Sequence, residues 1–124
     1  MNKNRIHTDN APAAIGPYSQ AIDLGEMIIT SGQIPVAPDG SVSEDISEQT
    51  RQALLNLKAV IEAGGSSFDK VIKITVFITD MAQFGAINAV YSEFFSEPYP
   101  ARSCVQVAAL PKGVSIEIEA IALK

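Results

Sequence analysis

The stretch VIKITVFIT, residues 71–79, decides the fold because aliphatic residues occupy every second position along it. Successive side chains of a β-strand point to opposite faces, so this spacing predicts a strand with one fully apolar side. Such a side has to be covered by another layer of secondary structure. The residues on it are Ile72, Ile74, Val76 and Ile78.

The segments before and after this strand are predicted to be amphipathic helices. Asp45 and Glu48 fit a capping box with Asp45 as the N-cap, and Gly64-Gly65 stands where a left-handed residue ends a helix. Asp80 and Gln83 repeat the cap pattern ahead of a second helix. The two apolar stripes are Ile46, Ala53, Leu54, Leu57, Val60 and Ile61, then Phe84, Ile87, Tyr91 and Phe94.

Four further strands complete the expected secondary structure. Residues 18–24 and 26–34 precede the first helix, and residues 101–110 and 114–123 follow the second. The turn residues Pro111-Lys112-Gly113 predict that the last two strands pair as an antiparallel hairpin. The order is ββαβαββ. We therefore expect an α+β fold, a mostly antiparallel sheet with two helices packed on one face.

The composition narrows the class of protein. The length of 124 residues suits a single domain over residues 1–124, and the hydrophobic content of 47% suggests a subunit interface. One cysteine excludes an intrachain disulfide and indicates a reducing compartment. Residues 1–5 lead into no hydrophobic segment and no apolar run approaches about 18 residues, so we expect a cytoplasmic protein without a membrane span. A net charge of −5 disfavours binding to nucleic acid.

The last two strands carry the residues best suited to chemistry. Arg102 shares a strand face with Cys104, and Glu117 shares one with Glu119. If the strands pair as a hairpin, Cys104 lies opposite Glu117 or Glu119, with Arg102 in diagonal reach. A guanidinium binds a carboxylate through two parallel hydrogen bonds, and a nearby acid accepts or steers a proton of water. The pair would suit a reaction on a small carboxylate; the simpler interpretation is a cross-strand salt bridge.

Several motifs, in order along the chain, resemble one known family. They are NAPAAIGPY (10–18), ITSGQIP (29–35), VFITD (76–80), PARSCV (100–105), Leu110-Pro111 and IEI (116–118). The set spans nearly the whole chain and resembles the Rid family, also called the YjgF/YER057c/UK114 family. The similarity is greatest to its RidA subgroup, the enamine/imine deaminases.

This resemblance implies a fold, an assembly and a reaction. The fold is like that of the small trimeric chorismate mutases, and the assembly is a homotrimer with active sites in the clefts between subunits. The reaction is cofactor-free hydrolysis of 2-enamino and 2-imino acids, such as 2-aminoacrylate, to 2-keto acids and ammonia. By the resemblance, Arg102 holds the substrate carboxylate and Glu117 positions the water. The residues that match the cleft lining are Tyr18, Ser31, Gly32, Asn88 and, through its backbone, Cys104.

Simpler interpretations stay open for several of these residues. Cys104 could be a nucleophile, but a thiol needs a base, and the only histidine, His7, lies in a segment expected to be irregular. No cluster of His, Cys and Asp has metal-ligand spacing, so no metal is expected. Tyr18 could pack in the core, Ser31-Gly32 could end a strand, and Asn88 could be an ordinary solvent-facing residue. Glu119 is expected to be a structural or rim charge.

Two functions of different classes compete with the deaminase. One is a non-catalytic trimer that binds a small ligand in its clefts or regulates other enzymes, which requires the arginine and not the acid. The second is an endoribonuclease, which the acidic balance and the missing basic stripe disfavour. Because Arg102 and Glu117 are both present, the sequence favours catalysis.

Overall fold

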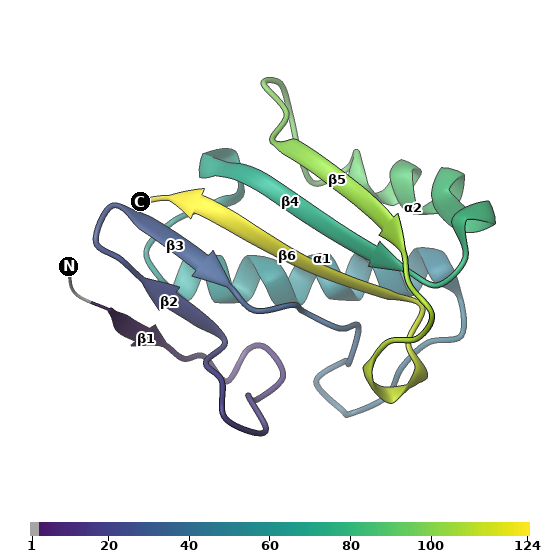
Figure 1. Ribbon diagram of the computed structural model, residues 1–124, viewed down its shortest axis with the longest axis horizontal. Helices are drawn as coiled ribbons and strands as arrows, with labels where there is room; N and C mark the ends of the chain where they lie inside the picture. The colour runs from purple at the N-terminus through teal and green to yellow at the C-terminus, as the bar shows by residue number, and fades with distance from the viewer. Residues whose placement is uncertain (1–2) are drawn as a thin grey trace.

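The protein is a sheet covered on one face by helices (Figure 1). The computed structural model describes residues 3–124. The first two residues of the segment 1–5, from which no leader sequence is expected, lie outside the described residues. Helices α1 (Ile46–Ala63) and α2 (Phe84–Tyr91) lie behind the sheet in Figure 1, and the face toward the viewer is open. This arrangement confirms the predicted α+β fold.

The sheet has six strands in the order β1-β2-β3-β6-β4-β5. All neighbours are antiparallel except β4 and β5, which are parallel because α2 crosses between them. Short 3-10 turns lie at Phe68–Lys70, Met81–Gln83 and Pro111–Gly113. The strands are β1 Asn4–Ile6, β2 Ala21–Asp23, β3 Met27–Thr30, β4 Val71–Ile78, β5 Ala101–Gln106 and β6 Ile116–Leu123.

Local sequence explains where α1 begins and ends. The Asp45 carboxylate accepts a hydrogen bond from the backbone N–H of Glu48 at 2.9 Å, which confirms the predicted N-cap. Gly65 has a φ of 86°, which confirms the left-handed residue predicted at the end of the helix. Neither helix of residues 3–124 is long and apolar enough to cross a membrane.

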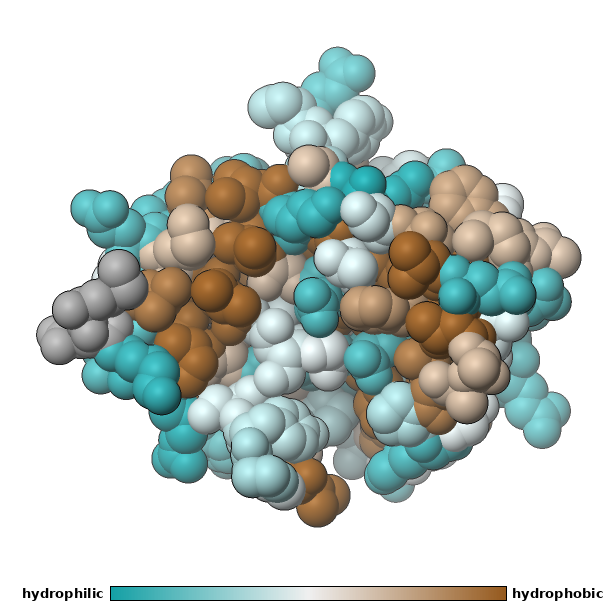
Figure 2. All heavy atoms as spheres, viewed as in Figure 1, coloured by the Kyte–Doolittle hydropathy of each residue, from teal (hydrophilic) through white to brown (hydrophobic). Residues whose placement is uncertain are grey.

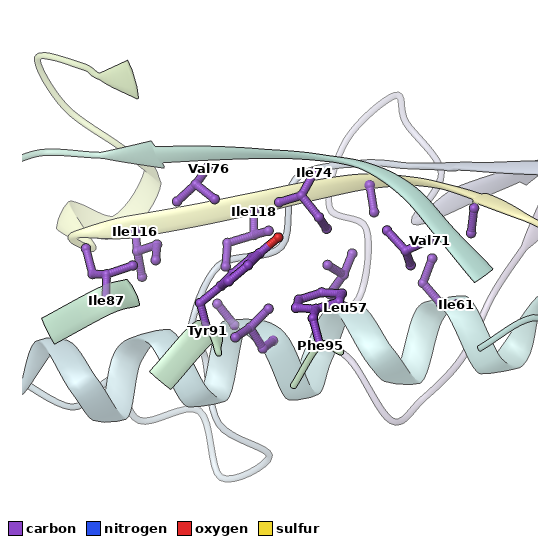
Figure 3. Packing of buried hydrophobic residues seen from close by; sticks show 14 of the residues in the cluster. Leu57, Ile61, Val71, Ile74, Val76, Ile87, Tyr91, Phe95, Ile116 and Ile118 are labelled. Carbon is purple, nitrogen blue, oxygen red and sulfur yellow. The ribbon is translucent and has the colours of Figure 1, made fainter. Parts of the chain in front are cut away.

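The core lies between the helices and strands β4 and β6 (Figure 3). Ile74, Val76 and Ile78 are buried there, as the alternation of the sequence predicts. Ile72 is an exception, because a bulge at the start of β4 turns Val71 inward and leaves Ile72 41% exposed. The buried apolar side therefore begins at Val71 and resumes at Ile74, with two residues between them instead of the one that regular alternation would leave.

Strand β1 is missing from the sequence prediction. It pairs with β2 from Asn4 opposite Asp23 to Ile6 opposite Ala21. Three residues are too few for an alternation to show, so the sequence predicts only an irregular segment here. Some strands are also shorter than predicted: β3 ends at residue 30 and β5 at residue 106.

The predicted hairpin of the last two strands is wrong. β4 lies between them, parallel to β5 and antiparallel to β6. The connection over residues 107–115 includes the turn Pro111–Gly113, and nine residues are long enough to pass the end of β4. β6 has one face of buried apolar residues, as an interior strand needs, whereas every residue of β5 is exposed or half-buried, as suits a strand at the edge.

Gly64→Ala should destabilise the fold. A Cβ at this position would lie 2.6 Å from the Cδ1 atoms of both Ile6 and Ile28, which are buried, so the core would have to shift. Overpacking of this kind lowers the free energy of unfolding by about 1–3 kcal/mol, which denaturant titration measures.

Gly85→Ala in α2 is the matched control for this substitution. No atom lies within 4 Å of a Cβ at residue 85, and helix propensity favours alanine there by up to about 1 kcal/mol. If Gly64→Ala were as harmless as Gly85→Ala, the close packing of residue 64 against Ile6 and Ile28 would be contradicted.

Candidate functional site

Strand β4 places the two charged candidates on opposite faces of the sheet. Arg102 pairs with Ile74, which is buried under the helices, so Arg102 lies on the helix face. Glu117 pairs with Phe77, whose side chain points the other way, so Glu117 lies on the open face. The prediction of one shared face is wrong, and so is the predicted pairing of Cys104 with Glu117. Within one chain the guanidinium and the acid do not meet.

The Arg102 guanidinium lies against α2. Its Nη1 donates a hydrogen bond to Asn88 Oδ1 at 2.7 Å. Its Cζ is 5.4 Å from the centre of the Phe84 ring and 4.6 Å from that of the Tyr91 ring. The ion pairs of residues 3–124 do not include Arg102, so the cross-strand salt bridge that the sequence left open is not formed in this part of the chain. The guanidinium keeps further N–H groups for an anion.

Cys104 follows on the same helix face and packs, half-buried, against the core. Burial raises the pKa of its thiol, and the Arg102 charge opposes this only in part. His7 follows β1, at the sheet edge opposite β5, and bonds to Asp9 at 3.1 Å. Five strand spacings, about 24 Å, separate the two edges, so His7 cannot activate the thiol. Within one chain, Cys104 is therefore a packed thiol without a nearby base.

The Glu117 carboxylate is half-buried on the open face, against the backbone of Gly32. A Cβ at residue 32 would lie 2.7 Å from Glu117 Cδ and nearer still to Oε2, so a side chain there would displace the acid from this position. Burial raises the pKa of Glu117, and repulsion by Glu119 on the same face raises it further. A carboxyl group in such a setting is suited to accept and return a proton. Glu119, predicted to be a structural or rim charge, is itself half-buried.

The loops that follow β1 and β3 border a cavity of about 710 Å³, whose wall includes Tyr18 and Gly32. Tyr18 is 52% exposed, so the core-packing interpretation of this residue is wrong. Ser31 and Gly32 directly follow β3, which agrees with a strand end. The Ser31 hydroxyl donates to the carbonyl of Ser19 at 2.6 Å and so ties the end of β3 to the loop beside Tyr18.

The predicted residues thus form two clusters in one chain. The arginine cluster on the helix face consists of Asn88, Arg102 and Cys104. The glutamate cluster consists of Glu117 and the adjoining Gly32, with Tyr18 on the same cavity wall as Gly32 and with Ser31 next to Gly32 in the chain. Phe84 and Tyr91, which contact Arg102, are missing from the site residues predicted by the sequence. Their spacing from Asn88, four and three residues along a predicted helix, is the signal that would have found them.

No group of three His, Cys, Asp or Glu side chains within residues 3–124 is arranged to hold a metal ion. The arginine cluster instead offers a cation, and the glutamate cluster offers an acid. A family model described as Endoribonuclease L-PSP matches residues 8–124. The chain belongs to this family.

Relatives of high identity extend over almost the entire chain. A Salmonella typhimurium 2-iminobutanoate/2-iminopropanoate deaminase is 58% identical over 123 residues, which cover 96% of each chain. The crystal structure of Escherichia coli TdcF with bound serine is 55% identical, with a TM-score of 0.94 over 98% of this chain and 99% of that one. RidA from the Antarctic bacterium Psychrobacter sp. PAMC 21119 is 45% identical, with a TM-score of 0.93 over 98% and 99%. These matches confirm the resemblance to the Rid family.

Glu117→Gln should stabilise the chain, and more so at higher pH. Burial and Glu119 raise the pKa of Glu117 above its ordinary value of 4.5 in the folded protein. The neutral form of Glu117 is therefore favoured by folding. This stabilisation is fully present below the pKa that Glu117 has in the unfolded chain, and it is lost as the pH rises through the pKa that Glu117 has in the folded chain. Glutamine does not ionise, so its gain in melting temperature should be larger at about pH 8 than at about pH 4.

Glu44→Gln, which changes an exposed acid, is the control for the altered net charge. Thermal unfolding at both pH values compares the two variants with the wild type. The prediction fails if the gain in melting temperature of Glu117→Gln equals that of Glu44→Gln at each pH, or if it shrinks as the pH rises. Either result would show that the Glu117 carboxylate is not the destabilised group.

Proposed function

We propose that the protein hydrolyses 2-imino and 2-enamino acids, such as 2-aminoacrylate, to 2-keto acids and ammonia, without a cofactor. The observation that carries this proposal is the Arg102 guanidinium, which is held in place but pairs with no carboxylate of residues 3–124. A guanidinium of this kind recognises a small carboxylate. The name of the Salmonella relative supports the reaction class. The serine bound to TdcF carries a carboxylate, as the proposed 2-imino acid substrate does.

In the proposed reaction, Arg102 binds the substrate carboxylate and an enamine first tautomerises to the imine. Water then adds across the C=N bond: its oxygen bonds to carbon, and Glu117 accepts a proton from the water and returns it to nitrogen. Glu117 next accepts the proton of the new hydroxyl group and passes it to nitrogen as the C–N bond breaks, so ammonia leaves and the carbonyl of the 2-keto acid forms. Each proton taken from water ends on ammonia, so Glu117 finishes the cycle in its starting state.

The sparse set of residues suits this chemistry. An imine is already electrophilic and hydrolyses in water by itself, so the barrier to be removed is small. Each tenfold acceleration requires about 1.4 kcal/mol, and orientation of reactants alone can supply several such factors. The raised pKa of Glu117 brings its proton affinity closer to that needed near neutral pH.

A second copy of the chain completes the site in this proposal. The two clusters lie on opposite faces of one sheet, so the edge strand β5 of one copy has to lie over the open face of another. The open face is suited to burial, because Ile29, Val105 and Leu123 are 42%, 41% and 45% exposed on it. Figure 2 views this face and shows its apolar patches. A head-to-tail contact forms a closed ring when its rotation divides the full circle, and we propose the homotrimer that the family resemblance implies.

Arg102→Ala should lower kcat/KM for 2-aminoacrylate by at least about a hundredfold, or about 2.7 kcal/mol, because the substrate carboxylate loses its charged partner. Freshly generated 2-aminoacrylate is supplied, and the release of ammonia and pyruvate is followed against a sample without protein. Arg51→Ala is the matched control, since that guanidinium already pairs with Glu93 at 3.2 Å. An Arg102→Ala variant as active as Arg51→Ala would refute the proposal.

The same proteins test the two competing functions. Saturable binding of a 2-keto acid without faster ammonia release would favour a non-catalytic binding protein. The family description names an endoribonuclease, so cleavage of single-stranded RNA is the third assay. RNA cleavage that survives Arg102→Ala, with no ammonia release by the wild type, would replace the deaminase with a nuclease. We propose the cytoplasm as the location, since the one cysteine is a free thiol.

A further inference from the structure

Helix α2 presents three side chains in one stripe to Arg102. Phe84, Asn88 and Tyr91 are four and three residues apart, which places them on the same side of a helix. Two of them contribute aromatic rings near the guanidinium carbon, and the third contributes an amide oxygen at 2.7 Å from Nη1. We name these three residues the α2 stripe.

All three residues of the α2 stripe are uncharged, and this distinguishes Arg102 from the paired cations of residues 3–124. Arg51 pairs with Glu93 and Lys124 with Asp23, so a carboxylate of the chain already offsets each charge. A ring face attracts a cation through its quadrupole, and an amide oxygen accepts a single hydrogen bond. The stripe therefore restricts the direction of the guanidinium while its full positive charge remains for a ligand.

The ring of Tyr91, rather than its hydroxyl, makes this contact. Tyr91 is only 6% exposed, and its hydroxyl is buried without a hydrogen-bond partner among residues 3–124. Burial raises the pKa of Tyr91, so the phenol stays neutral beside Arg102. Figure 3 shows the ring lying between the helices and the sheet. A group enclosed in this way cannot touch a substrate, and it acts through the guanidinium.

We propose that the α2 stripe consists of positioning residues, which set the affinity of the site for the substrate carboxylate. This inference rests on the proposed function. A free arginine side chain loses rotamer freedom when it binds a ligand, and this loss opposes binding. The α2 stripe has already removed much of that freedom before the ligand arrives. Loss of the stripe should therefore weaken carboxylate binding and leave the chemistry at the imine carbon intact.

The kinetic consequence is a change in KM rather than in kcat. The carboxylate does not react, so Arg102 binds it equally in the ground state and in the transition state. We expect Tyr91→Leu and Asn88→Ala each to raise KM about tenfold, equivalent to about 1.4 kcal/mol, with kcat within about twofold of the wild type. Tyr91→Phe keeps the ring and should rescue KM to within about twofold of the wild-type value.

Two further measurements do not depend on catalysis. The first is the dissociation constant of 2-oxobutanoate, a stable 2-keto acid, which should rise about tenfold in Tyr91→Leu and Asn88→Ala but not in Tyr91→Phe. The second is the Arg102 Nε–H resonance, assigned by its disappearance in Arg102→Ala. The nearby rings shift this signal in the wild type and in Tyr91→Phe, and the shift should diminish in Tyr91→Leu.

The outcomes separate this inference from the proposed function. If Tyr91→Leu and Asn88→Ala bind 2-oxobutanoate as tightly as the wild type, or lower kcat at constant KM, the positioning role is overturned. If 2-oxobutanoate binding depends on the stripe but the wild type hydrolyses no imine, the positioning role stands and the proposed function is overturned. Should Tyr91→Leu fail to fold, Phe84→Leu replaces it, because Phe84 lies outside the buried core.

Discussion

Strand β4 is the constraint on which the rest of the site depends. It pairs with β5 along one side and with β6 along the other, and its alternating side chains determine which face each neighbour shares. Ile74 and Val76 must face the helices, so Arg102 and Cys104 face them too, and Glu117 faces away. A shift of one residue in the register would bring Ile74 out of the core. Hydrophobic burial therefore holds the two charges apart within one chain.

The two charges are left without a partner of opposite sign in residues 3–124, although the same chain pairs several charges elsewhere. Lys124 lies 2.7 Å from Asp23 and lowers the pKa of that carboxyl group, whereas burial and a neighbouring acid raise the pKa of Glu117. An acid in such a setting destabilises the fold in its charged form, and perturbed groups of this kind cluster at functional sites. The arginine, held by two rings and an amide, has the complementary property of a charge without a counterion. A ligand bound between two copies of the chain would explain both.

Much of the fold could be predicted from local patterns, whereas the pairing of distant strands could not. The cap at Asp45, the left-handed Gly65 and the alternation of residues 74–78 each depend on a few neighbouring residues, and each is found in the structure. The antiparallel hairpin was inferred from the turn at residues 111–113, but α2 returns the chain parallel to β4 and leaves β6 an interior position. The family motifs identified Arg102 and Glu117 and could not reveal that they lie on opposite faces. The contacts of Phe84 and Tyr91 with Arg102 depend on how α2 packs, which no motif records.

Complementation between two inactive chains tests most directly whether the site is shared between copies. Arg102→Ala and Glu117→Gln are each prepared, then unfolded and refolded together in equal amounts, with separately refolded samples as controls. In a ring, a site is intact when one chain supplies Arg102 and its neighbour supplies Glu117, so random mixing should restore about a quarter of the wild-type activity. Mixed assemblies, verified by their mass, that remain as inactive as the separate variants would contradict the account.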